Sequence, residues 1–171
     1  MKENTLIAVY DNHDDAAWAV ETLLNGGINK FHITVLGRGD FEEYDKFEFN
    51  KENEDAVFWG EQGAFWGALW GFLLGGLVVF VPGFGSLVAS GPLIGSLSGL
   101  AAGATLGAAV SAMVAWFMDL GMTKAEAKHY EDMLKQGKNL VIVQGSVEEV
   151  KKAKSLLENQ GKGEVKLHLK S

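Results

Sequence analysis

The sequence predicts an α+β fold in which two copies of a strand–helix–strand unit flank a long apolar insertion. Residues 6–36 align without a gap on residues 140–170, which indicates an internal repeat. Chance similarity between two ordinary units is the alternative. Between the copies, a run of 57 residues from 62 to 118 contains no Asp, Glu, Lys, Arg or His. Nine glycines within this run fall on two ladders with a spacing of four residues.

The first strand–helix–strand unit begins with a short apolar run, Leu6–Tyr10, of the kind found in interior strands. Asn12 followed by Asp15 is a weak capping pattern for the helix, and Gly27 suits the left-handed residue that ends it. Residues 31–36 alternate between apolar and polar, which is typical of a half-buried strand. An acidic stretch with four aromatic residues follows, and it is compatible with either an edge strand or a loop.

The apolar insertion predicts a hairpin of two helices. The first helix is expected over residues 58–81 and the second from near Ser90 to near Gly121. Proline cannot continue helical hydrogen bonding and glycine permits a turn, so the hairpin turn is expected at Pro82, Gly83 and Gly85. The first helix would be roughly 36 Å long, enough to cross a bilayer core of about 30 Å.

The glycine ladders predict how these helices pack. Residues four apart share one face of a helix, so each ladder is a groove along which two backbones approach closely. Glycine costs about 1 kcal/mol per residue in a helix interior, and close packing has to recover that loss. The glycines predicted to mediate helix packing and oligomerisation are Gly63, Gly67, Gly71, Gly75, Gly91, Gly95, Gly99, Gly103 and Gly107.

The chain after the insertion is predicted to add one helix and then the second copy of the repeat. Residues 123–137 read as a helix that opens with a capping box. Leu140–Gln144 repeats the first apolar strand, and Ser146 with Glu149 forms a second capping box. Residues 165–169 alternate like the last strand of the first copy. Two such units make a ferredoxin-like sandwich, with helices on one face of a four-stranded antiparallel sheet.

The domain boundaries and composition follow the same division. Residues 1–55 and 122–171 are expected to form the two halves of the α+β domain, with the apolar hairpin at 56–121. The formal net charge of −7 argues against nucleic acid, because a nucleic-acid-binding protein presents a basic face. The absence of cysteine excludes a disulfide framework and a thiol nucleophile. The N-terminus leads into a strand rather than a signal-peptide core, so we expect the chain to start in the cytoplasm.

The flanks of the insertion suggest how it would meet a membrane. Trp59, Trp66, Trp70 and Trp116 gather near its charged ends, as in an aromatic belt at a membrane surface; packing in a core or an oligomer is the alternative. The turn region 82–92 contains no Lys or Arg, whereas both flanks contain lysines. The positive-inside rule therefore predicts that both flanks are cytoplasmic.

The sequence offers little catalytic chemistry. One cluster resembles a metal site: Asp11, His13, Asp14 and Asp15. We interpret it as a helix cap with acidic residues that complement the helix dipole, and expect no metal. Three histidines are isolated along the chain and are expected at the surface or an interface: His32, His129 and His168. Neither a G-x-S-x-G motif nor a P-loop occurs, so we expect neither an enzyme nor a cofactor.

Several segments resemble those of a bacterial family of small general-stress membrane proteins, largely of unknown function. The segments that carry the resemblance are 8–11, 59–60, 67–71, 81–85, 91–93, 130–131 and 135–137. The resemblance covers most of the chain and implies a stress-linked, non-enzymatic role without active-site residues. Glycine-zipper hairpins recur in oligomeric membrane proteins, so we expect a homo-oligomer.

The sequence therefore predicts a non-enzymatic, homo-oligomeric, membrane-associated stress protein with a structural or protective role through its hairpin. Two alternatives remain: a soluble self-assembling protein that buries its hairpins in a ring or shell, and a module that senses a small ligand. The expected partners are further copies of the chain and a lipid bilayer. The expected location is the bacterial inner membrane with both termini cytoplasmic, and the alternative is a cytoplasmic assembly.

Overall fold

The computed structural model describes residues 4–38, 77–81, 85–93, 96 and 111–169. The described residues form a mixed α and β structure, which confirms the predicted α+β class. Its elements are β1 (Asn4–Tyr10), α1 (His13–Asn25), the 3₁₀ turn η1 (Lys30–His32), β2 (Ile33–Arg38), β3 (Leu77–Val81), β4 (Gly85–Ser90), α5 (Ala112–Asp119), α6 (Lys124–Lys135), β5 (Asn139–Gly145), α7 (Val147–Glu158) and β6 (Glu164–His168).

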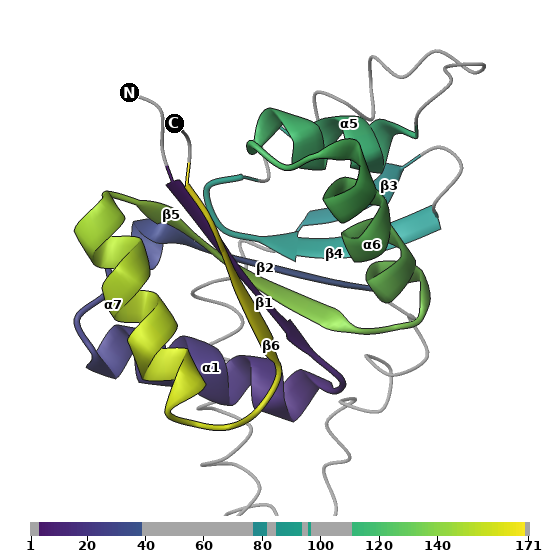
Figure 1. Ribbon diagram of the computed structural model, residues 1–171. Coiled ribbons are helices and arrows are strands. Elements are labelled where there is room, and N and C mark those ends of the chain that lie inside the picture. The colour runs from purple at the N-terminus through teal and green to yellow at the C-terminus, as the bar shows by residue number, and fades with distance from the viewer. Residues whose placement is uncertain (1–3, 39–76, 82–84, 94–95, 97–110, 170–171) are drawn as a thin grey trace, which may run out of the picture.

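The strands form one antiparallel sheet in the order β3-β4-β2-β5-β1-β6. Strand β1 lies between β5 and β6, so that Ile7 is opposite Ile142 on one side and Lys166 on the other. Strand β5 also pairs with β2, which brings Val35 opposite Val141. Residues of the two copies of the repeat therefore share one sheet, as the sequence predicts. The start of β1 and the end of β6 consequently lie side by side, with Thr5 opposite His168 (Figure 1).

Helices cover both faces of the sheet (Figure 1). Helices α1 and α7 lie on one face and pack against alternate residues of β1, including Leu6 and Ala8. Helices α5 and α6 lie on the other face and pack against the other set of alternate residues of β1, Ile7 and Val9. Because successive residues of a strand point to opposite faces, a strand covered on both sides is apolar throughout. All seven residues of β1 are buried accordingly.

Three predicted helix starts are capped by the expected residues, and at α7 the Ser146 hydroxyl accepts from the Glu149 N–H at 3.2 Å. The side chain of Asn12 accepts a hydrogen bond from the backbone N–H of Asp15 at 2.8 Å, which caps α1. At α6, the Thr123 hydroxyl accepts from the Glu126 N–H, while the Glu126 carboxylate accepts from the Thr123 N–H at 3.0 Å. Each cap satisfies backbone donors that the first helical turn leaves without a partner.

The structure corrects the predicted helical hairpin. Residues 77–81 and 85–90, where the end of the first helix and the approach to the second were expected, are strands β3 and β4. They pair antiparallel, with Val81 opposite Gly85, and β4 pairs with β2. An uncharged run does not distinguish a helix from a buried strand. Valine and phenylalanine dominate β3, and these residues favour strands when a neighbouring strand edge is present.

Gly91 belongs to the predicted second ladder, but it lies in a turn and not in a helix. Its φ of 111° is in the left-handed region that favours glycine. A Cβ at this position would lie 2.3 Å from the carbonyl oxygen of Ile33 and 2.7 Å from Cα of Thr34, so the backbone of β2 approaches closely. The remaining ladder and turn glycines except Gly85, together with Pro82, lie outside the described residues.

The last part of the insertion is helix α5, which lies against the sheet. Trp116 and Phe117 are buried, and the indole Nε1 of Trp116 donates to the hydroxyl of Ser96 at 3.0 Å. The predicted aromatic belt is therefore wrong for Trp116, which belongs to the core together with Phe117. Among the helices of the described ranges, none has the length and apolar character needed to cross a membrane.

Candidate functional site

A pocket of about 480 Å³ lies where β1 leaves the sheet. The last sheet pairs of β1 are Tyr10 with Asn139 of β5 and Val9 with Glu164 of β6. The pocket thus lies between the segments that lead into β5 and β6, beside the first turn of α1. We call it the strand-end pocket, and its lining residues are Val9, Tyr10, Asp11, Asp15, Met133, Lys138, Lys162, Gly163 and Glu164.

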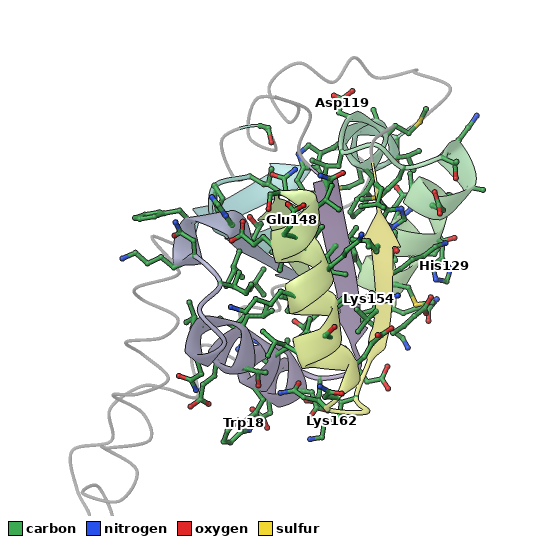
Figure 2. The ribbon with its side chains drawn as sticks, turned by 60° about the vertical axis from the view of Figure 1, so that its left-hand side comes forward. Trp18, Asp119, His129, Glu148, Lys154 and Lys162 are labelled. Carbon is green, nitrogen blue, oxygen red and sulfur yellow. The ribbon has the colours of Figure 1, made fainter. Side chains whose placement is uncertain are left out.

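Two lysines line the strand-end pocket from opposite flanks. Lys138 immediately precedes β5, and its ammonium group lies 2.6 Å from Oδ1 of Asp11. Lys162 lies in the turn that leads into β6, and its ammonium group lies 2.7 Å from Oδ1 of Asp15. Figure 2 shows Lys162 at this turn, beyond the end of α7. The two ion pairs connect the start of α1 to the segments that lead into β5 and β6.

The two carboxylates differ in how firmly they are held. The side chain of Asp11 is 81% exposed, whereas that of Asp15 is 25% exposed. Asp15 accepts hydrogen bonds from Lys162 and from Nδ2 of Asn12, which lower the pKa of its carboxyl group in that order of importance. The Asp15 carboxylate is consequently fixed in place, while Asp11 has room to change partner.

Tyr10 and Gly163 form a tightly packed wall of the pocket. The Tyr10 hydroxyl is buried and has no hydrogen-bond partner among the described residues. Burial, and secondly the charge of Asp15, raises the pKa of Tyr10 to about 12. Gly163 has a φ of 78°, and a Cβ there would lie 2.6 Å from the carbonyl oxygen of Val9 and 2.7 Å from the Tyr10 ring. A larger residue at position 163 would collide with this wall.

The cluster that resembles a metal site is a helix start. Asn12 caps α1, and Asp14 and Asp15 occupy its first turn, where they complement the helix dipole. Asp11 and Asp15 each pair with a lysine. In the part of the chain that the structure describes, no three His, Cys, Asp or Glu side chains come together as metal ligands would. The interpretation as a helix cap is confirmed.

The structure corrects the expectation for one of the three histidines. His168 is 8% exposed, and its Nε2 lies 3.0 Å from the hydroxyl of Tyr130 on α6. Its Nδ1 lies 3.7 Å from Oε1 of Glu126, which is also paired with Lys166 at 2.8 Å. The contact joins α6 to β6, which are distant in sequence, so no local pattern points to it. Desolvation lowers the pKa of His168.

The other two histidines lie at the surface, as expected. His32 is paired through Nδ1 with Glu149 at 2.8 Å, and its side chain is 40% exposed. His129, labelled in Figure 2, has a side chain that is 46% exposed.

A buried carboxylate, which the sequence does not single out, connects α5 to α6. Glu131 is 2% exposed. Its carboxylate accepts a hydrogen bond from the Ser111 hydroxyl at 2.6 Å and pairs with Lys128 at 3.0 Å and Lys135 at 3.2 Å. Burial alone would raise the pKa of Glu131, but the hydrogen bonds from these three residues lower it below its ordinary value. Ser111 is also the N-cap of α5, so this cluster stabilises the helix pair.

Comparisons with known proteins give no assignment: no protein-family model, curated protein or solved structure matches the chain significantly.

Proposed function

We propose that the chain is a non-enzymatic, homo-oligomeric protein whose glycine-ladder segments pack against those of other copies. A structural or protective role under stress is our proposal from the resemblance to the general-stress family. The observation that carries the assembly proposal is the position of β3 and β4 in the sheet.

Strands β3 and β4 divide the apolar insertion into two connections. Residues 39–76 join β2 to β3, and residues 94–110 join β4 to α5. Each connection therefore begins and ends at the sheet and its covering helices, which we call the body. A chain that crosses a bilayer and returns needs two spans of about 20 apolar residues each.

Neither connection contains enough apolar residues for two such spans. The uncharged part of the first connection, residues 62–76, contains 15 residues, and the second connection contains 17. These short apolar lengths argue against a hairpin of two bilayer-crossing helices and favour burial of the glycine ladders between copies. The assembly alternative, located in the cytoplasm, is therefore the one we propose.

We further propose that the body is a ferredoxin-like unit made by duplication. Strands β6-β1-β5-β2 are antiparallel in that order, with α1 and α7 on one face. The acidic members of two ion pairs support the duplication: Asp15 in the first turn of α1 pairs with Lys162 before β6, and Glu149 in the first turn of α7 pairs with His32 before β2, although Lys162 and His32 do not align with each other. Asp15 and Glu149 are separated by the repeat offset of 134 residues.

Helices α5 and α6 cover the other face of this four-stranded unit. The buried polar groups of α6, Glu131 and Tyr130, make contacts with other elements: Glu131 with Ser111 at the start of α5, and Tyr130 with His168 of β6. These contacts support a structural role and leave the glycine-ladder segments as the proposed assembly surface.

The test is the mass and partition of the full-length protein. We expect a particle of several copies in the supernatant of a detergent-free lysate. Gly71→Leu and Gly99→Leu should reduce the particle mass, because a leucine cannot fit where two backbones touch. Ser155→Leu, at an exposed position of α7, is the matched control and should leave the mass unchanged.

Two results would contradict the proposal. Recovery of the protein in the membrane pellet, with release by detergent alone, would favour bilayer insertion. A monomer mass in both fractions would exclude the homo-oligomer.

A further inference from the structure

We propose that the strand-end pocket binds a small zwitterionic ligand, such as a free amino acid. The lysines Lys138 and Lys162 would hold the carboxylate of the ligand, and Glu164 and Asp11 would hold its ammonium group. The pocket is formed by the body of a single chain, so this proposal does not depend on assembly of the glycine ladders.

The dimensions of the pocket fit such a ligand. Pockets for small molecules typically enclose about 300–1,000 Å³, and the strand-end pocket encloses about 480 Å³. Its lining comes from β1, the first turn of α1, the last turns of α6 and the turns that precede β5 and β6. The exposed lining is mostly polar, which suits a small polar ligand.

The lysines retain donors for an anionic group. An ammonium group carries three N–H donors. Among the described residues, Lys138 and Lys162 each use one donor for a carboxylate. In the Lys138–Asp11 pair the aspartate side chain is 81% exposed and the lysine side chain is 30% exposed. Because exposed ion pairs contribute little to stability, exchange of Asp11 for a ligand carboxylate at Lys138 costs little free energy.

The carboxylates of the pocket select against a simple anion. Asp11, Asp15 and Glu164 oppose two ammonium groups, which leaves a formal excess of one negative charge. The Glu164 side chain is 58% exposed, and its contact with His129 is long, at 3.8 Å. A ligand ammonium group would find acceptors at Glu164 and at the released Asp11. A ligand with both charges therefore matches the pocket better than phosphate or an alkylamine does.

The uncharged wall formed by Tyr10 and Gly163 favours a binding site over two ion pairs with a purely structural role. Two ion pairs alone would suffice to hold the start of α1. The buried Tyr10 hydroxyl, however, lacks a partner among the described residues. Buried hydroxyl groups normally have a hydrogen-bond partner, so the Tyr10 side chain is a feature of this pocket that the two ion pairs do not account for. Gly163 keeps this wall in place, because a side chain there would collide with Val9 and Tyr10.

The experiment is a titration of the full-length protein with each L-amino acid separately, at millimolar concentration. Backbone amide shifts in the nuclear magnetic resonance spectrum, above all those of Gly163 and Lys138, report binding at the pocket. Inorganic phosphate and butylamine, at equal ionic strength, test the anion alone and the cation alone. We expect saturable shifts at Gly163 and Lys138 for one or more amino acids and no saturation for phosphate or butylamine.

Variants connect the binding to the pocket. Lys138→Met and Lys162→Met remove a charge but keep the length of the side chain, and each should weaken binding at least tenfold. Lys154→Met is the matched control. It removes a lysine that is paired with Glu158 on the outer surface of α7, away from the lining of the pocket (Figure 2). This control should bind like the parent protein.

Three outcomes would overturn the proposal. The first is that no amino acid shifts the pocket amides of the parent protein. The second is that phosphate or butylamine alone saturates the same signals, which would assign a site for a single charge. The third is that both lysine variants bind like the Lys154 control, which would leave the ion pairs as structural bridges.

Discussion

Two glycines that bracket Lys162 allow backbone conformation and close packing to be separated. Gly161 and Gly163 both have positive φ, of 62° and 78°. A Cβ on Gly161 would have nothing within 4 Å, whereas a Cβ on Gly163 would lie 2.6 Å from the carbonyl oxygen of Val9. Alanine at either position pays the same conformational cost, but only alanine at position 163 also collides with the pocket wall.

The expected magnitudes follow from these two terms. A left-handed conformation costs an L-residue roughly 1–2 kcal/mol, which is the whole expected loss for Gly161→Ala. Overpacking against backbone adds about 1–3 kcal/mol, so Gly163→Ala should lose about 2–5 kcal/mol. In a chain of this length, each kcal/mol lowers the melting temperature by roughly 2–4 °C. The larger loss should therefore be resolved clearly.

Urea unfolding followed by far-ultraviolet circular dichroism, at one fixed protein concentration, measures both variants. Gly137→Ala serves as a second control, because it combines a φ of 83° with open space around the added Cβ. Equal losses for Gly161→Ala and Gly163→Ala would refute the packing argument. A loss for Gly137→Ala as large as that for Gly163→Ala would show that backbone conformation alone accounts for the effect.

Three further predictions concern the polar contacts of α5 and α6. Ser111→Ala should cost about 1–3 kcal/mol in urea unfolding, because it removes the N-cap of α5 and deprives the buried Glu131 carboxylate of a hydrogen bond; a change within error would show that neither contact contributes measurably to stability. Thr123→Ala removes the cap of α6 and should cost about 1 kcal/mol, measured in the same way. Burial lowers the pKa of His168 in the folded state below the unfolded value of 6.5. The contribution of the neutral His168 side chain to stability is therefore present above pH 6.5 and is lost as the pH falls below that value. His168→Gln should make the unfolding free energy less dependent on pH across that range, and an unchanged dependence would contradict this assignment.

The repeat made most of the body predictable from the sequence. The alignment of residues 6–36 with 140–170 depends on apolar runs and caps that are local in sequence. Local signals of this kind remain valid in the folded state when the two copies pair, as β1 and β5 do. The start of α1 was interpreted correctly for the same reason, since Asn12 and Asp15 lie within one helical turn.

The insertion was predicted less well because its signal is ambiguous. The Leu77–Val81 segment is uncharged, and an uncharged segment is compatible with a membrane helix, a buried helix or a buried strand. The available edge of β2, which selects the strand for Gly85–Ser90, is a tertiary feature. The strand-end pocket was missed for a related reason. Its two lysines are far from Asp11 and Asp15 in sequence, and they meet only because β1 lies between β5 and β6.

The central position of β1 has a consequence for the order of events on the ribosome. Strand β1 is synthesised before the apolar insertion, whereas its two neighbours, β5 and β6, are synthesised after it. At roughly 5–20 residues per second, the partners of β1 emerge about 6–30 seconds after it. During that interval the seven residues of β1, all buried in the finished sheet, are exposed to water. The glycine-rich segments emerge within the same interval. Nascent chains of this protein should therefore bind holding chaperones until β6 is released, and chains truncated before Asn139 should stay bound or aggregate.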